Sequence, residues 1–120
     1  ADAPAADGAG RRDYVQVSGL AGAHLGALDH LRAGGASLTL KCGDGRGYSV
    51  LEIVEVGKRV WGRDFEGRRS PRRAGDPAQI VAEAARIRER LGWQPRHDDL
   101  DAIVGQALAW EERLEKRNRI

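Results

Sequence analysis

The stretch DYVQVSGLAGAHLGALDHLRAGGASLTLKC, residues 13–42, decides the fold class. It opens with a β-type run at 13–17 and closes with a second one at 37–42. Between these runs, small and apolar residues recur at helical spacing until two glycines stop the helix: Leu20, Ala23, His24, Ala27, Leu28, Leu31, Gly34 and Gly35. Because a strand, a helix and a strand in this order favour a right-handed βαβ unit, the stretch predicts an α/β fold with a parallel sheet.

The remainder of the chain adds three helices and a loop. Ser49 and Glu52 form a capping-box pattern, which predicts a helix from 49 to about 62. Further helices are expected over 80–91, ended by a glycine, and over about 99–117. A short strand is expected within 64–69. The sum is two or three short strands with four helices, an incomplete parallel sheet whose edges are open.

Length and composition restrict the class of protein. The chain has 120 residues, of which 41% are hydrophobic and 32% charged, and this suits one small folded domain. The formal net charge of +2 gives no general attraction to nucleic acid or to a membrane, so anion binding has to be local. Cys42 is the only cysteine, which excludes a disulfide framework and a thiolate metal cluster. No signal peptide or membrane span is apparent, and a cytoplasmic location is expected.

Two glycine-rich stretches imitate nucleotide-binding motifs. Gly19, Gly22 and Gly26 follow a predicted strand, but the third glycine comes one residue late for G-x-x-G-x-x-G, and G-x-G-x-x-G does not fit either. We interpret them as small residues where a helix packs closely on a sheet. GDGRG, residues 43–47, lacks the following Lys-Ser or Lys-Thr of a phosphate-binding loop and is adequately explained as a tight turn.

The segment SPRRAGDPAQI, residues 70–80, is a candidate anion site. Its two adjacent arginines, Arg72 and Arg73, offer guanidinium forks that suit phosphate, and Asp76 offers a carboxylate that can accept hydrogen bonds from neighbouring hydroxyls. The same residues have simpler explanations: solvated charges on a loop that also bears Arg68 and Arg69, and a helix N-cap at Asp76. Nucleic-acid contact is disfavoured because no aromatic residues interleave with the arginines.

The sequence as a whole resembles the C-terminal part of the UDP-glucose 4-epimerase family, which is NAD-dependent and belongs to the extended short-chain dehydrogenases. The resemblance is carried, in order, by DAPAADGAGRRDYVQVSGLAGAHLGALDHL, KCGDGRGYSVLEIVE, SPRRAGDPAQIVAE and RIRERLGWQPRHDDLDAIVGQALAWEERL. It implies the C-terminal part of an extended Rossmann-type fold. Its expected parts are a loop at 1–12, a βαβα piece at 13–62, and a substrate-side loop with terminal helices at 63–120.

The resemblance also implies a UDP-binding role for four residues. Arg12 matches the family's first diphosphate-binding arginine, with Tyr14 beside it; Arg73 matches the second arginine; and Asp76 matches the aspartate that accepts from the uridine ribose. The neighbouring Arg11 is the alternative to Arg12, and ordinary strand packing is the alternative for Tyr14. The resemblance further places Gly19 where the family has a helix-capping aspartate.

The activity implied is interconversion of UDP-glucose and UDP-galactose through an NAD-dependent 4-keto intermediate. The sequence contains neither the family's G-x-x-G-x-x-G nor its catalytic Y-x-x-x-K, since neither Tyr14 nor Tyr48 has a lysine four residues later. We therefore expect no catalytic, cofactor-binding or metal-binding residue in this chain, no NAD binding by the chain alone, and an N-terminal NAD-binding half that is absent. The alternative is a truncated remnant, or a UDP-binding module without epimerase activity.

The expected partners follow from the same motifs. A UDP-sugar is expected to bind, whereas nucleic acid and membranes are not. Self-association through exposed apolar helix faces is expected, including the face of the last helix that carries Leu100, Val104 and Leu108.

Overall fold

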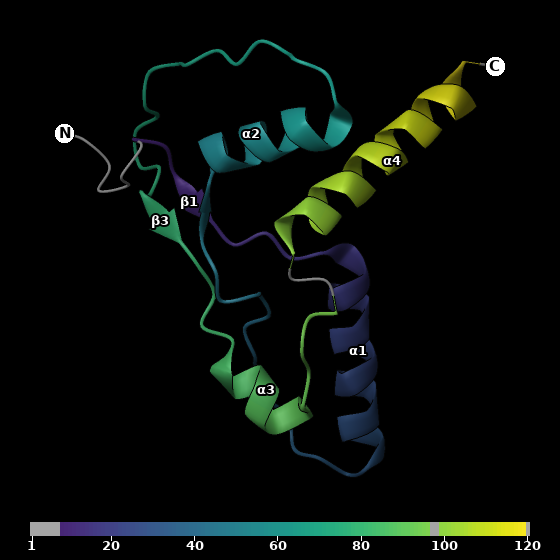
Figure 1. Cartoon of the computed structure of the whole chain (residues 1–120). Coiled ribbons are helices and arrows are strands. Elements are labelled where there is room, and N and C mark those ends of the chain that lie inside the picture. The colour runs from purple at the N-terminus through teal and green to yellow at the C-terminus, as the bar shows by residue number, and fades with distance from the viewer. Residues whose placement is uncertain (1–7, 97–98, 120) are drawn as a thin grey trace.

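The computed structural model describes residues 8–96 and 99–119, and four helices lie in this part of the chain. They are α1 (Val17–Arg32), α2 (Val50–Trp61), α3 (Ala85–Leu91) and α4 (Leu100–Asn118). Figure 1 shows α1 beside α3 at one end of the molecule, and α2 beside α4 at the other. The predicted α/β class with four helices is confirmed.

A small three-stranded sheet joins the two ends. Its strands are β1 (Arg11–Arg12), β2 (Tyr48–Ser49) and β3 (Gln79–Ile80), in the spatial order β2-β1-β3. β1 runs antiparallel to β2 and parallel to β3, so the sheet is mixed rather than parallel. The sheet therefore brings together three segments that are far apart in the sequence.

The strands predicted at 13–17, 37–42 and 64–69 are wrong as strand assignments. All three segments lie outside the strands of the described residues, although the Asp13 N–H donates to the Ile80 carbonyl. A β-type sequence needs a neighbour to complete its backbone hydrogen bonds, and composition cannot supply that neighbour. Residues 64–69 are exposed, as are Leu38 and Thr39.

The start of α1 is fixed by a glutamine. The Gln16 side-chain oxygen accepts a hydrogen bond from the Gly19 backbone N–H at 2.9 Å, which makes Gln16 the N-cap. The Gln16 amide also donates to the Gln106 side chain of α4 at 2.5 Å. The cap that the resemblance placed at Gly19 therefore lies three residues earlier, and it links α1 to α4.

The core lies between α1 and α3. Ala23, Ala84, Ile87 and Trp93 are buried together, and Leu91 packs against them. The Trp93 indole N–H donates to the Gly19 carbonyl at 2.8 Å. The glycines of α1 therefore do allow close packing, but against α3 and the segment that follows it rather than against a sheet.

α2 keeps its predicted bounds, whereas α3 is shorter than predicted. The Ser49 hydroxyl accepts from the Glu52 N–H, and the Glu52 carboxylate accepts from the Ser49 N–H, so the capping box is confirmed. α3 begins at Ala85 rather than at Ile80. Residues 79–80 pair with β1 instead, and the Asp13 N–H, directly after β1, donates to the Ile80 carbonyl at 3.1 Å.

Candidate functional site

A cavity of about 680 Å³ opens between α2 and the long loop that connects α2 to β3. Three kinds of surface line it: glycine-rich backbone before β1, apolar side chains from the first turns of α2, and the arginine-rich loop. The lining residues are Gly8, Ala9, Gly10, Val50, Leu51, Val54, Gly67, Arg68, Arg69, Ser70, Pro71, Arg72, Arg73, Asp76, Pro77 and Ala78. The cavity therefore combines an apolar wall with a cationic rim.

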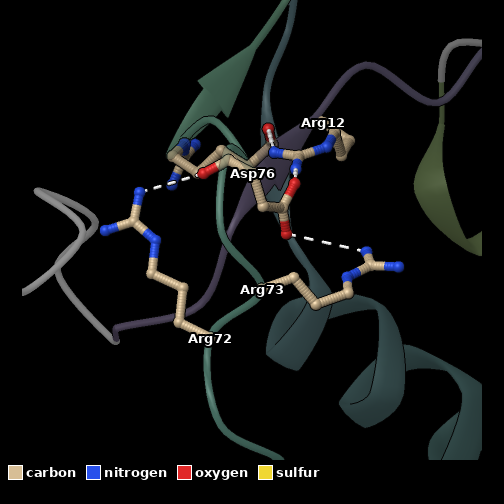
Figure 2. Close-up of polar contacts among 5 residues, drawn as sticks. Arg12, Arg72, Arg73 and Asp76 are labelled. Atoms are coloured by element: carbon tan, nitrogen blue, oxygen red, sulfur yellow. Dashed lines mark hydrogen bonds and ion pairs between the residues drawn. The ribbon is translucent and has the colours of Figure 1, made fainter.

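Asp76 is the centre of the polar part of this site (Figure 2). Its Oδ1 accepts a hydrogen bond from Arg12 Nη2 at 2.7 Å, and its Oδ2 lies 3.6 Å from Arg73 Nη2. The structure thus brings together Arg12, Arg73 and Asp76, three of the four residues predicted for UDP binding. Arg12 does not line the cavity itself, but it binds Asp76, which does.

A turn between Arg73 and Asp76 produces this arrangement. The Asp76 N–H donates to the Arg73 carbonyl at 3.3 Å, and Gly75 adopts the positive φ of 78° that the turn requires. Arg72 donates from Nη2 to the Asp76 carbonyl at 2.9 Å. Asp76 is not the N-cap of a helix, because α3 begins nine residues later and its N-cap is Ala84.

The structure also distinguishes between the two neighbouring arginines of β1. Arg11 donates to the Gly47 carbonyl and lies 3.8 Å from the Glu52 carboxylate, on the side of β2 and α2. Arg12 instead donates to the Arg11 carbonyl at 2.7 Å and to Asp76. Arg12 is therefore the one paired with the loop, and its contact with a diphosphate stays a prediction.

Tyr14 is not brought into the cavity. It is half-buried outside the lining, as expected for a residue that packs beside β1. Burial raises the pKa of the Tyr14 phenol, and the nearby charge of Arg12 opposes that shift to a smaller extent. Its role in binding UDP stays a prediction.

Asp13 is a positioning residue that the sequence patterns did not identify. Its carboxylate accepts backbone hydrogen bonds from Asp44, Gly45 and Ala82 at 3.0, 3.1 and 3.2 Å. A Cβ atom on Gly43 would lie 2.5 Å from Asp13 Oδ2, so the loop at 43–45 needs glycine to approach this closely. Asp13 therefore fixes the segments around Arg12 and β3 relative to each other. Its one sequence signal is its position directly after Arg12.

The described residues do not offer a dinucleotide site on the glycines of α1. Gly19 and Gly22 face Trp93, and Gly26 faces Leu91, so their open sides are already filled by the protein's own packing. The part of the chain that the structure describes also contains no group of three or more His, Cys, Asp or Glu side chains that could hold a metal ion. Within the same part, no helix is long and apolar enough to cross a membrane.

Comparison with known proteins gives a consistent family. A UDP-glucose 4-epimerase from Azospirillum brasilense is 54% identical over 110 residues, which are 92% of this chain and 32% of that protein. One from Lacticaseibacillus casei is 42% identical over 111 residues, covering 92% of this chain and 34% of the relative. No family model matches the sequence.

Solved structures give the same result. The UDP-glucose 4-epimerase of Stenotrophomonas maltophila, with bound NAD and formylated UDP-arabinopyranose, superposes with a TM-score of 0.90 at 38% identity over 95% of this chain and 34% of that one. The UDP-Glc/GlcNAc 4-epimerase of Campylobacter jejuni superposes with a TM-score of 0.84 at 41% identity over 92% of this chain and 33% of that one.

The chain thus spans about one third of the length of the relatives it matches. Nearly all of its own length is matched, in sequence and in backbone fold, and this is consistent with the C-terminal portion of those enzymes. The resemblance to the UDP-glucose 4-epimerases is confirmed, and this is the family to which the chain is related.

Proposed function

We propose that the chain provides the UDP-facing surface of a UDP-glucose 4-epimerase. Arg12 and Arg73 would contact the diphosphate, and Asp76 would accept hydrogen bonds from the ribose hydroxyls. Tyr14 would lie beside Arg12. The observation that carries the proposal is the convergence of two arginines on one carboxylate at the edge of a cavity large enough for a ligand.

The chemistry of the cavity suits a nucleoside diphosphate. Guanidinium groups match phosphate oxygens, and a carboxylate matches two neighbouring hydroxyls. Val50, which is about half exposed, and Val54 offer an apolar wall on which the face of a nucleobase could rest. A phosphate alone would leave this wall unused.

The epimerisation itself requires a hydride acceptor and a base. When bound, NAD supplies the hydride acceptor for conversion of UDP-glucose to UDP-galactose through the 4-keto sugar. We propose that the residues that hold NAD and move the proton belong to the portion of the relatives outside these 120 residues. The 120-residue chain alone should then bind UDP without epimerising a UDP-sugar.

The proposal is tested by recording two-dimensional amide NMR spectra of the chain during titration with UDP. We expect peaks of the 67–78 loop and of the first turn of α2 to shift. Arg73→Ala should weaken UDP binding by about tenfold, because it removes a charge-assisted contact to phosphate. Arg63→Ala is the matched control, since Arg63 lies over the Trp61 ring and outside this cavity. Equal binding by the wild type and both variants, or no response to UDP, would refute the proposal.

A further inference from the structure

The Asp76 carboxylate forms ion pairs with both arginines proposed for the phosphates. Arg12 Nη2 lies 2.7 Å from Oδ1 and Arg73 Nη2 lies 3.6 Å from Oδ2, so the carboxylate stands between the two guanidinium groups (Figure 2). Asp76 is therefore both a proposed ligand for a ribose and an internal anion that occupies the phosphate-binding charges.

The two arginines are held to different extents. The Arg12 side chain is 27% exposed and is also fixed by its bond to the Arg11 carbonyl, whereas the Arg73 side chain is 86% exposed. An incoming phosphate can therefore reach Arg73 at little cost. A phosphate that binds at Arg12 Nη2 competes there with Asp76.

This exchange has an electrostatic consequence. Once Arg12 and Arg73 turn to a phosphate, the Asp76 carboxylate loses its partners and lies close to a second anion, which repels it. A free anion such as pyrophosphate offers nothing to offset this cost. A nucleoside diphosphate offers ribose hydroxyls, which can donate hydrogen bonds to the released carboxylate.

We infer that Asp76 is a specificity-determining residue that excludes anions lacking a vicinal diol, by competing with them for Arg12 and Arg73. The inference rests on the proposed function and adds a second role to Asp76: rejection of the wrong ligand as well as contact with the right one. Selectivity of this kind uses an unfavourable interaction with the competitor in addition to a favourable one with the ligand.

The test compares pyrophosphate, without added metal, and UDP as ligands of the wild type and of Asp76→Asn. Asparagine has nearly the same size as aspartate, but it has no charge to hold the arginines. We expect pyrophosphate to bind about fivefold more tightly to the variant, as the loss of one partly buried ion pair suggests. The affinity for UDP should stay the same or fall, so the preference for UDP over pyrophosphate should fall by about fivefold or more.

The matched control is Asp64→Asn. It makes the same change in net charge but removes a carboxylate that pairs with Lys58 at 2.9 Å, outside the cavity. Any general gain in anion affinity from the added positive charge will appear in this control as well. If the affinity for pyrophosphate rises equally in both variants, the inference is wrong. The proposed function is still upheld in that case if the wild type binds UDP and Arg73→Ala weakens that binding.

A measurement on the wild type keeps the test decisive if Asp76→Asn loses its dispersed amide spectrum. UDP is compared with its 2′,3′-dideoxy analogue, which keeps both phosphates and the base. The inference requires the analogue to bind at least fivefold more weakly, close to the affinity of pyrophosphate plus the contribution of the base. Equal binding of UDP and the dideoxy analogue would overturn the inference together with the proposed ribose contact of Asp76, while the proposed phosphate contacts would stand. Failure of the wild type to bind UDP would remove the proposed function and this inference together.

Discussion

At the scale of single residues, the Asp13 side chain holds two separate backbone segments in place. Its carboxylate accepts three hydrogen bonds from backbone N–H groups in two segments, one at Asp44 and Gly45 and the other at Ala82. Neither segment lies in a helix or strand, and the Asp13 carboxylate ties both to the end of β1. The position of Arg12 depends on its neighbour for this reason.

Replacing Asp13 by Asn should lower the free energy of unfolding by about 1–3 kcal/mol. The amide has a single acceptor oxygen and no charge, so at least one of the three donors would lose its partner. Urea denaturation measures the change, and an unaltered m-value shows that stability alone has moved. The exposed Asp29→Asn serves as control and should change stability by about 0.5 kcal/mol or less. A similar small effect at Asp13 would contradict its assignment as a positioning residue.

The residue scale also shows what sequence could and could not predict. Arg73 and Asp76 could be placed together because a turn with glycine separates them by only three residues. The pairing of Arg12 with Asp76 was not predicted: the resemblance assigned both residues to one ligand, but they lie 64 residues apart and no local pattern joins them to each other. Asp13 was missed because its three partners are backbone groups, which look alike in every sequence.

At the scale of helices and strands, local signals decided which predictions were confirmed. α2 begins where its capping box indicates, and α4 begins at the residue after Asp99, whose side chain accepts from the Asp101 N–H. The strands were misplaced because their formation depends on distant partners rather than on their own residues. α3 lost its first turn to the pairing of β1 with β3, a tertiary effect that overrides helical spacing.

The contact between α2 and α4 should respond to pH. Arg59 donates from both terminal nitrogens to Asp101, at 2.5 and 2.7 Å. These hydrogen bonds, aided by the charge of Arg59, hold the pKa of the Asp101 carboxyl below its ordinary value, and burial opposes the shift to a smaller extent than the hydrogen bonds. A carboxyl with a lowered pKa in the folded state stabilises the fold above the unfolded pKa of about 3.9 and loses this contribution as the pH falls through the folded value.

The expected result is therefore a stability difference between the wild type and Asp101→Asn that is present at pH 7 and shrinks as the pH falls below about 4, through the lowered pKa of Asp101. Urea denaturation at several pH values from 7 down to 3 measures it. Salt should reduce the difference at pH 7, because the pair is exposed and screened by ions. A difference that stays constant with pH would mean that the aspartate acts through helix packing rather than through its charge.

At the scale of the whole molecule, the chain is more open than a compact domain of its length. Its radius of gyration is 17.4 Å, whereas about 14 Å is typical of 120 residues. The buried core is small, and four large apolar side chains of α1 face outward: Val17 is 75% exposed, Leu25 65%, Leu31 58% and Leu28 43%. An apolar face of this kind favours contact with another protein surface.

The isolated chain should therefore self-associate as its concentration rises, and Leu25→Lys should shift the equilibrium toward the monomer. Sedimentation equilibrium measures both. Ala109→Lys on α4 is the matched control, because it adds the same charge to another exposed helix position. A chain that stays monomeric at high concentration, or an equal effect of both variants, would show that the face of α1 is not the surface of association.

The long sequence separation between Arg12 and Asp76 determines when the site can form during synthesis. Ribosomes add roughly 5–20 residues each second, and Asp76 follows Arg12 by 64 residues, so the arginine is made about 3–13 seconds before its partner. Helix α2 can form in that interval, since its cap and its hydrogen bonds are local. The anion site can accordingly form only once residue 76 has been added, and a nascent chain stopped before that residue would carry Arg12 without the carboxylate that holds it.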